Sequence, residues 1–138
     1  MKNRKIIITL VVGLIFLGMT FCAAYAAQFL QVNRTDTGVA YVSGGVGVDE
    51  RNEMKKLVKD YNLKLIFATL KGNYLSGITV IVEDASGNHI METKTDGPWL
   101  FARLPSGKYK IISTYKGVKK TQTVEVNSGL ATVMFHWS

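Results

Sequence analysis

The feature that most constrains this chain is a two-residue alternation of apolar and polar side chains that begins at Asn62 and continues, with short interruptions, almost to the last residue. Successive side chains of a β-strand point to opposite faces, so this alternation predicts strands that each bury one face. The first segment is an example, because Leu63, Leu65 and Phe67 fall on one face. The alternation therefore places the second half of the chain in the all-β class.

Turn-forming residues divide this region into segments spaced by about 8 to 12 residues. Glycine, proline, asparagine and aspartate interrupt the alternation at 71–73, 85–88, 96–98, 104–107, 116–117 and 127–129. Seven short strands with this spacing are typical of an Ig-like sandwich, in which two sheets bury alternate residues against each other. We therefore predict a seven-stranded β-sandwich over residues 62–138.

A different period precedes the strands. Residues 49–61 are predicted to form a short amphipathic helix, because apolar residues recur with i, i+3, i+4, i+7 spacing at Met54, Leu57, Val58 and Tyr61. We expect this stripe to pack on the sandwich, and the alternative is a helix face that binds a partner. Residues 27–48 show no sustained period and include a glycine-rich stretch at 43–47, so a flexible N-terminal arm is expected there.

Residues 1–26 have the three-part layout of a secretory signal peptide. Three basic residues open the chain, an apolar run follows over 6–21, and small residues stand at Ala24 and Ala26. We expect cleavage after Ala26, no transmembrane segment in the mature chain, and a periplasmic or extracellular location. A retained anchor is the alternative, because residues 6–27 have just enough length to span a bilayer.

The only cysteine of the chain, Cys22, lies in this predicted leader. The bulky Phe21 before it does not fit a lipoprotein signal, so we expect no lipid on Cys22. The mature chain would then lack cysteine, and its apolar core alone must keep it folded. The formal net charge of +7 also falls, because three basic residues leave with the leader. A mildly basic remainder does not indicate nucleic-acid binding, and no nucleic-acid partner is expected.

The order of the strand and turn motifs resembles that of a known family of domains. A valine-rich strand, an Asp-Gly turn and a Leu-Pro-x-Gly-x-Tyr corner follow one another at 77–87, 95–97 and 104–109. With this order of motifs, residues 63–137 resemble the carboxypeptidase regulatory-like domains, a branch of the prealbumin-like (transthyretin-like) sandwiches. The stretches 41–47, 61–68 and 96–99 look like those of a group of small exported proteobacterial proteins. The resemblance implies a fold and specifies no activity.

Five residues of these turns are interpreted as structural. Asp96 is expected to cap its own turn, and Gly97 to take a positive φ. Pro105 fixes φ in the next turn, and Gly107 is expected to adopt a backbone angle that a Cβ would oppose. Tyr109 is expected to bury its ring and to donate a hydrogen bond to a backbone carbonyl upstream, as tyrosine corners do.

The chemically active side chains argue against catalysis and metal binding. His89 and His136 each stand alone in a strand pattern, and no spacing of zinc ligands accompanies them. The adjacent acids Glu83 and Asp84 would point to opposite faces of a strand, which suits acid–base catalysis poorly. The related hydroxyisourate hydrolases end in Tyr-Arg-Gly-Ser, a tail that this chain lacks. We predict no catalytic residue, no metal and no cofactor.

Two features remain as possible ligand contacts. Trp99 and Phe101 follow a turn and offer rings for stacking on a sugar, although packing is the favoured interpretation. Five lysines crowd one predicted hairpin, at Lys108, Lys110, Lys116, Lys119 and Lys120. The favoured interpretation is that these lysines protect an edge strand from aggregation. The alternative is that Lys108 and Lys110 contact an anionic glycan or phospholipid headgroup.

The sequence therefore predicts an exported, non-catalytic interaction or accessory module that engages an envelope protein or glycan. A carbohydrate-binding module that uses exposed aromatic side chains is the alternative.

Overall fold

The computed structural model describes residues 30–138. The predicted signal peptide and Cys22 lie outside the described residues. Within them the chain forms nine strands, one α-helix and one 3-10 helix, in the order β1 (Asn33–Arg34), β2 (Ala40–Gly44), α2 (Gly47–Leu57), η1 (Val58–Asp60), β3 (Leu63–Thr69), β4 (Thr79–Glu83), β5 (His89–Lys94), β6 (Trp99–Arg103), β7 (Gly107–Tyr115), β8 (Val118–Val126) and β9 (Ala131–Trp137).

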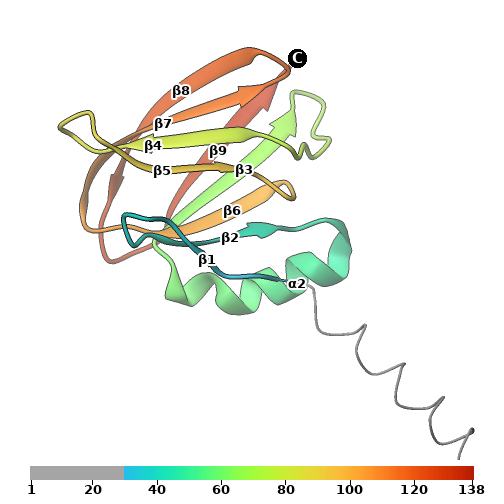
Figure 1. Ribbon diagram of the computed structural model, residues 1–138. Coiled ribbons are helices and arrows are strands. Elements are labelled where there is room, and N and C mark those ends of the chain that lie inside the picture. Colours follow the sequence, from blue (N-terminus) through green and yellow to red (C-terminus); the bar gives the residue numbers. More distant parts are fainter. Residues whose placement is uncertain (1–29) are drawn as a thin grey trace, which may run out of the picture.

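These strands form two sheets that pack face to face (Figure 1). The five-stranded sheet has the order β1-β2-β6-β3-β9, and the four-stranded sheet has the order β5-β4-β7-β8. All neighbouring strands are antiparallel except β3 and β9, which run parallel. The all-β prediction is confirmed at this level. The seven strands predicted over 62–138 correspond to β3–β9, and the sandwich also contains β1 and β2, which were not predicted.

The added strands correct the expectation of a flexible arm over 27–48 for its described part, residues 30–48. All five residues of β2 pair with β6, from Ala40 opposite Arg103 to Gly44 opposite Trp99. Val42, in the middle of β2, is fully buried. The β-branched and aromatic residues around it favour a strand. A single short strand beside a glycine-rich stretch gives too few alternations to be recognised from the sequence.

The main core lies between the two sheets. The five-stranded sheet contributes the fully buried Leu65 and Phe67 of β3 and Phe135 of β9, and the four-stranded sheet contributes Val80 of β4 and Ile111 of β7. The rings of Phe67 and Phe135 stack with centroids 5.9 Å apart. Burial of alternate residues on both sheets explains why the two-residue period is so regular from β3 onward.

A second, smaller core lies on the opposite face of the five-stranded sheet, under helix α2 (Figure 1). Met54 of α2 is fully buried and Tyr61 is buried just after η1, and both pack with Val42, Trp99 and Phe101 of the sheet. The expectation that the apolar stripe of the helix packs on the sandwich is therefore confirmed.

The helix begins two residues before the predicted Asp49, and side chains of its first turns hold the preceding loop. The Gly45 N–H donates a hydrogen bond to Glu50 Oε1 at 2.9 Å. Arg51 Nη1 donates to the Gly45 carbonyl at 3.0 Å. Gly45 itself has φ +93, in the left-handed region that favours glycine. The glycine-rich stretch is thus a fixed connection between β2 and α2.

The two turn glycines differ from their predicted conformations, since neither lies in the left-handed region. A Cβ on Gly97 would lie 2.3 Å from the Gly44 carbonyl oxygen, so this position needs glycine because two backbone segments approach closely. A Cβ on Gly107 would meet only the ring of Tyr109, at 3.7 Å. Gly107 therefore starts β7 without a steric requirement for glycine.

Of the other turn residues, Tyr109 makes its predicted contact and Asp96 does not. The Tyr109 hydroxyl donates to the Pro105 carbonyl at 2.7 Å, which is the contact expected of a tyrosine corner. Asp96 does not cap its own turn, because its carboxylate makes no hydrogen bond within residues 30–138. Instead the Asp96 N–H donates to Ser43 Oγ at 2.9 Å, which ties the turn to the end of β2.

Candidate interaction surface

The four possible ligand contacts named from the sequence lie on opposite sides of the molecule. Trp99 and Phe101 lie on β6 and face α2, with their rings stacked at a centroid distance of 6.1 Å. Lys108 and Lys110 lie on β7, on the outer face of the four-stranded sheet, where both are exposed. The structure therefore does not combine these residues into one site.

Trp99 is a packing residue, as the favoured interpretation had it. Only 5% of the residue is exposed. Lys64 of β3 closes its remaining side, with Nζ 4.0 Å from the Trp99 ring centroid. Burial lowers the pKa of Lys64, and the neighbouring Lys55 lowers it further. A sugar ring has no access to the face of Trp99 while α2 and Lys64 cover it.

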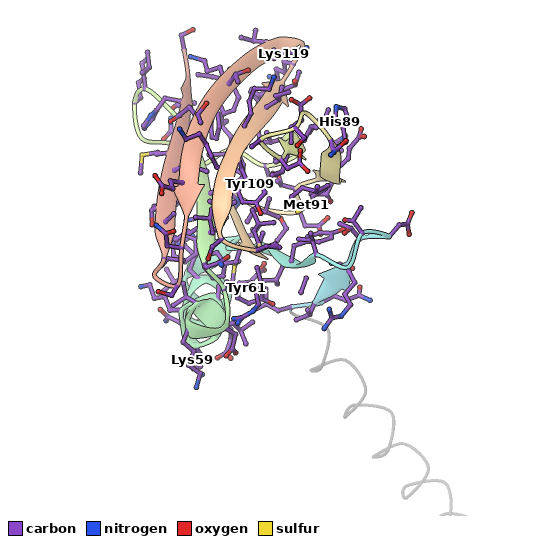
Figure 2. All side chains as sticks on the ribbon, turned by 90° about the vertical axis from the view of Figure 1, so that its left-hand side faces the viewer. Lys59, Tyr61, His89, Met91, Tyr109 and Lys119 are labelled. Carbon is purple, nitrogen blue, oxygen red and sulfur yellow. The ribbon has the colours of Figure 1, made fainter. Side chains whose placement is uncertain are left out.

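Lys110 takes part in an ion-pair network on the outer face of the four-stranded sheet. Its Nζ lies 2.9 Å from Glu83 Oε2, and Glu83 Oε1 lies 2.9 Å from His89 Nε2. The hydrogen bond from Lys110 is the main reason why the pKa of Glu83 lies below its usual value. His89 projects from the start of β5 into solvent (Figure 2). The charge of Lys110 is thus neutralised locally.

The remaining lysines of this hairpin gather at its tip. The residues Lys116 and Gly117, with φ of 46 and 77, form a two-residue turn of type I′ between β7 and β8. Both central positions of this turn need positive φ, and only the second is a glycine. The turn holds Lys116 and the first residues of β8, including Lys119 and Lys120, in an exposed position.

Trp137 fastens this tip to the loop that follows β3. Its indole Nε1 donates to the Val118 carbonyl at 3.0 Å, and its own carbonyl accepts from the Leu70 N–H at 2.9 Å. The ring of Tyr115 meets the Trp137 ring edge-on, with centroids 5.9 Å apart. Two segments far apart in the sequence therefore meet at one buried tryptophan.

The result is a basic and partly apolar end of the sandwich, called here the basic end, formed by Leu70, Lys71, Lys116, Val118, Lys119 and Lys120. Leu70 is 72% exposed and Val118 is 53% exposed. Residues 66–82 and 111–124, which carry these side chains, contain no acidic residue. Lys119 lies at the opposite end of the molecule from Lys59 of η1 (Figure 2).

Sequence reasoning found the hairpin lysines and missed the rest of the basic end. Leu70 and Lys71 belong to a different turn, and only their connection through Trp137 places them beside the hairpin. An exposed leucine inside a turn signal is the one hint that the sequence offers. Contacts that join distant segments cannot be read from local patterns.

A groove of about 370 Å³ lies between the β1–β2 turn and β5, with Arg34, Asp36, Tyr41 and His89 among its lining residues. No three histidine, cysteine, aspartate or glutamate side chains of residues 30–138 lie close enough to share a metal ion. Neither helix in this part of the chain is long and apolar enough to cross a membrane.

No protein-family model and no curated protein matches the chain.

Proposed function

We propose that this protein is an exported, non-catalytic interaction module that engages an anionic component of the cell envelope through the basic end. The observation that carries the proposal is the convergence of four lysines and two exposed aliphatic side chains around Trp137. The signal-peptide layout of residues 1–26 supports export to a periplasmic or extracellular location. The carboxypeptidase regulatory-like (prealbumin-like) fold is part of the proposal, supported by the motif order and by the two-sheet architecture.

The physical case rests on charge and on exposed apolar area. Each lysine near an anionic membrane surface contributes about 1 kcal/mol, so four lysines supply about 4 kcal/mol. That energy corresponds to a gain in affinity of about a thousandfold over a neutral surface. Leu70 and Val118 add apolar area at the same place, which favours contact with the boundary between headgroups and acyl chains.

The rigidity of the basic end also favours a binding role. The hairpin is held by the indole N–H of Trp137 and the Leu70 loop by its backbone carbonyl, and Trp137 is only 3% exposed. A fixed arrangement loses less conformational entropy on binding than a flexible one.

A binding experiment with charge-neutral variants tests the proposal. The purified protein is titrated with vesicles of pure phosphatidylcholine and with vesicles that contain phosphatidylglycerol, and in a separate series with a soluble anionic polysaccharide. Lys71, Lys116 and Lys120 are changed together to glutamine. The matched control changes Lys55, Lys56 and Lys59 to glutamine, which removes the same charge from the opposite end of the molecule.

We expect binding to the phosphatidylglycerol vesicles and not to the neutral ones, with at least a tenfold loss in the variant of the basic end and little change in the control. Binding should also weaken as salt rises, because exposed charges are screened. Binding to the polysaccharide alone would keep the basic end as the interaction surface, and the partner would then be an anionic glycan instead of a membrane. Equal losses in both variants would refute the proposal, since net charge and not this surface would then determine binding.

A further inference from the structure

Strand β8 is the long edge strand of the four-stranded sheet, and its contacts with β9 include a hydrogen bond from Gln122 Nε2 to the Met134 carbonyl at 2.7 Å. It has nine residues, pairs only with β7 among the described strands, and is exposed over its first six positions. Exposed edges of this length are the usual template for pairing with another strand. The question is which strand fits this edge.

The hairpin turn determines which backbone groups of β8 are free. In a type I′ turn the first residue after the turn donates its N–H back to the residue before it, so Val118 faces Tyr115 of β7. Backbone groups that face one neighbour recur at every second residue of an antiparallel strand. The N–H and C=O groups of Lys119, Thr121 and Thr123 therefore point away from β7, as do those of Glu125.

We infer that β8 pairs with β8 of a second copy of this chain, in antiparallel orientation about a two-fold axis at Gln122. In this register Lys119 lies opposite Glu125 of the second copy, and Thr121 lies opposite Thr123 of the second copy. The two-fold axis repeats both pairs. The sheet then continues through both copies as β5-β4-β7-β8-β8-β7-β4-β5.

Charge complementarity supports this register. Within residues 30–138 neither Lys119 nor Glu125 makes an ion pair, so both are available. Opposite charges and threonine pairs directly across an antiparallel ladder stabilise the pairing. All four residues lie on the outer face of the sheet, because their β7 partners are Thr114, Ile112, Lys110 and Lys108.

The neighbouring registers lose this charge complementarity. Free backbone groups occur at every second residue, so the nearest alternatives shift the axis to Thr121 or Thr123. The first shift places Lys119 opposite Thr123 and Glu125 opposite Gly117, and the second places Lys119 opposite Asn127. Edge lysines usually oppose strand pairing, and of these three registers only the one centred on Gln122 places Lys119 opposite an acidic residue.

Charge reversal and charge exchange test the pairing. The mass of the purified protein in solution is measured by light scattering over a range of concentrations. We expect a dimer whose Kd rises at least tenfold in Lys119→Glu, because the introduced carboxylate would lie opposite Glu125 at both symmetry-related pairs. The exchange Lys119→Glu/Glu125→Lys restores the complementary charges and should return the Kd close to that of the parent.

A cysteine at the two-fold axis tests the register directly. Gln122→Cys, combined with Cys22→Ser, should form a disulfide-linked dimer under mild oxidation, since Cβ atoms of directly opposed residues approach closely. Thr121→Cys in the same background is the control and should cross-link poorly, because it lies opposite Thr123. A parent that is monomeric at all concentrations, or equal cross-linking at both positions, would overturn the inference. Both measurements are made without vesicles, and the vesicle variant leaves Lys119 unchanged, so failure of the pairing and failure of membrane binding are distinguishable.

Discussion

Replacement of Gly97 by alanine tests how the β5–β6 turn meets the end of β2. The added Cβ would lie 2.3 Å from the Gly44 carbonyl oxygen and 2.4 Å from the Gly44 carbonyl carbon. Both atoms belong to the backbone of a paired strand, so they cannot move aside as a flexible side chain would. Overpacking a close contact costs about 1–3 kcal/mol, and we expect about 3 kcal/mol here. For a domain of this size that corresponds to a fall in Tm of roughly 12–24 °C.

Gly107→Ala is the matched control, because both glycines belong to turn motifs and neither has a positive φ. Its Cβ would make ordinary contact with Tyr109, at 3.7 Å. We expect a change of no more than about 1 kcal/mol, of either sign. Urea unfolding, followed by tryptophan fluorescence and by circular dichroism, measures both variants. If Gly97→Ala unfolded at the same midpoint as the parent, or if Gly107→Ala were the more damaging change, the close-approach argument would be refuted.

Three further predictions concern single side chains. Tyr109→Phe removes the hydrogen bond to Pro105 and should cost about 1 kcal/mol in urea unfolding; an unchanged midpoint would mean that the corner contributes nothing. Trp99→Ala opens a cavity under α2 and should cost about 3–5 kcal/mol, without affecting any glycan binding of the folded parent. A stable Trp99→Ala variant that loses glycan affinity would instead favour carbohydrate binding. The lowered pKa of Glu83 stabilises the fold above the usual glutamate pKa of about 4.3, and this contribution is lost as the pH falls through the folded-state pKa. Glu83→Gln should flatten the fall in stability between about pH 5 and about pH 3, and an equally steep fall in the variant would exclude this carboxyl as its source.

The strands from β3 onward were predictable because each buries one face in the same core. Every second residue of β7, for example, faces the opposite sheet, and Tyr109 and Ile111 show this pattern directly in the sequence. The helix was predictable for the same reason, because Met54 and Tyr61 belong to one apolar stripe that is buried against the sheet. Periodic burial leaves a local signal, and the sequence retains it.

The failures have a common physical origin in contacts between distant segments. Gly97 is needed because of Gly44, which lies 53 residues earlier in the sequence and approaches it only in the folded sheet. β2 is a single short strand, and its conformation depends on its pairing with the distant β6. The basic end likewise depends on Trp137, which joins the Leu70 loop to the hairpin. Local composition cannot encode which segments will meet.

Nuclear magnetic resonance of the labelled protein with anionic bicelles tests the central proposal most directly. Amide shifts are followed while bicelles that contain phosphatidylglycerol are added, and phosphatidylcholine bicelles serve as the control. We predict that the anionic bicelles selectively shift the amides of residues 70–73 and 116–120, on either side of Trp137. Shifts centred on α2, Gly47–Leu57, or equal shifts with neutral bicelles, would contradict the assignment of the basic end as the interaction surface.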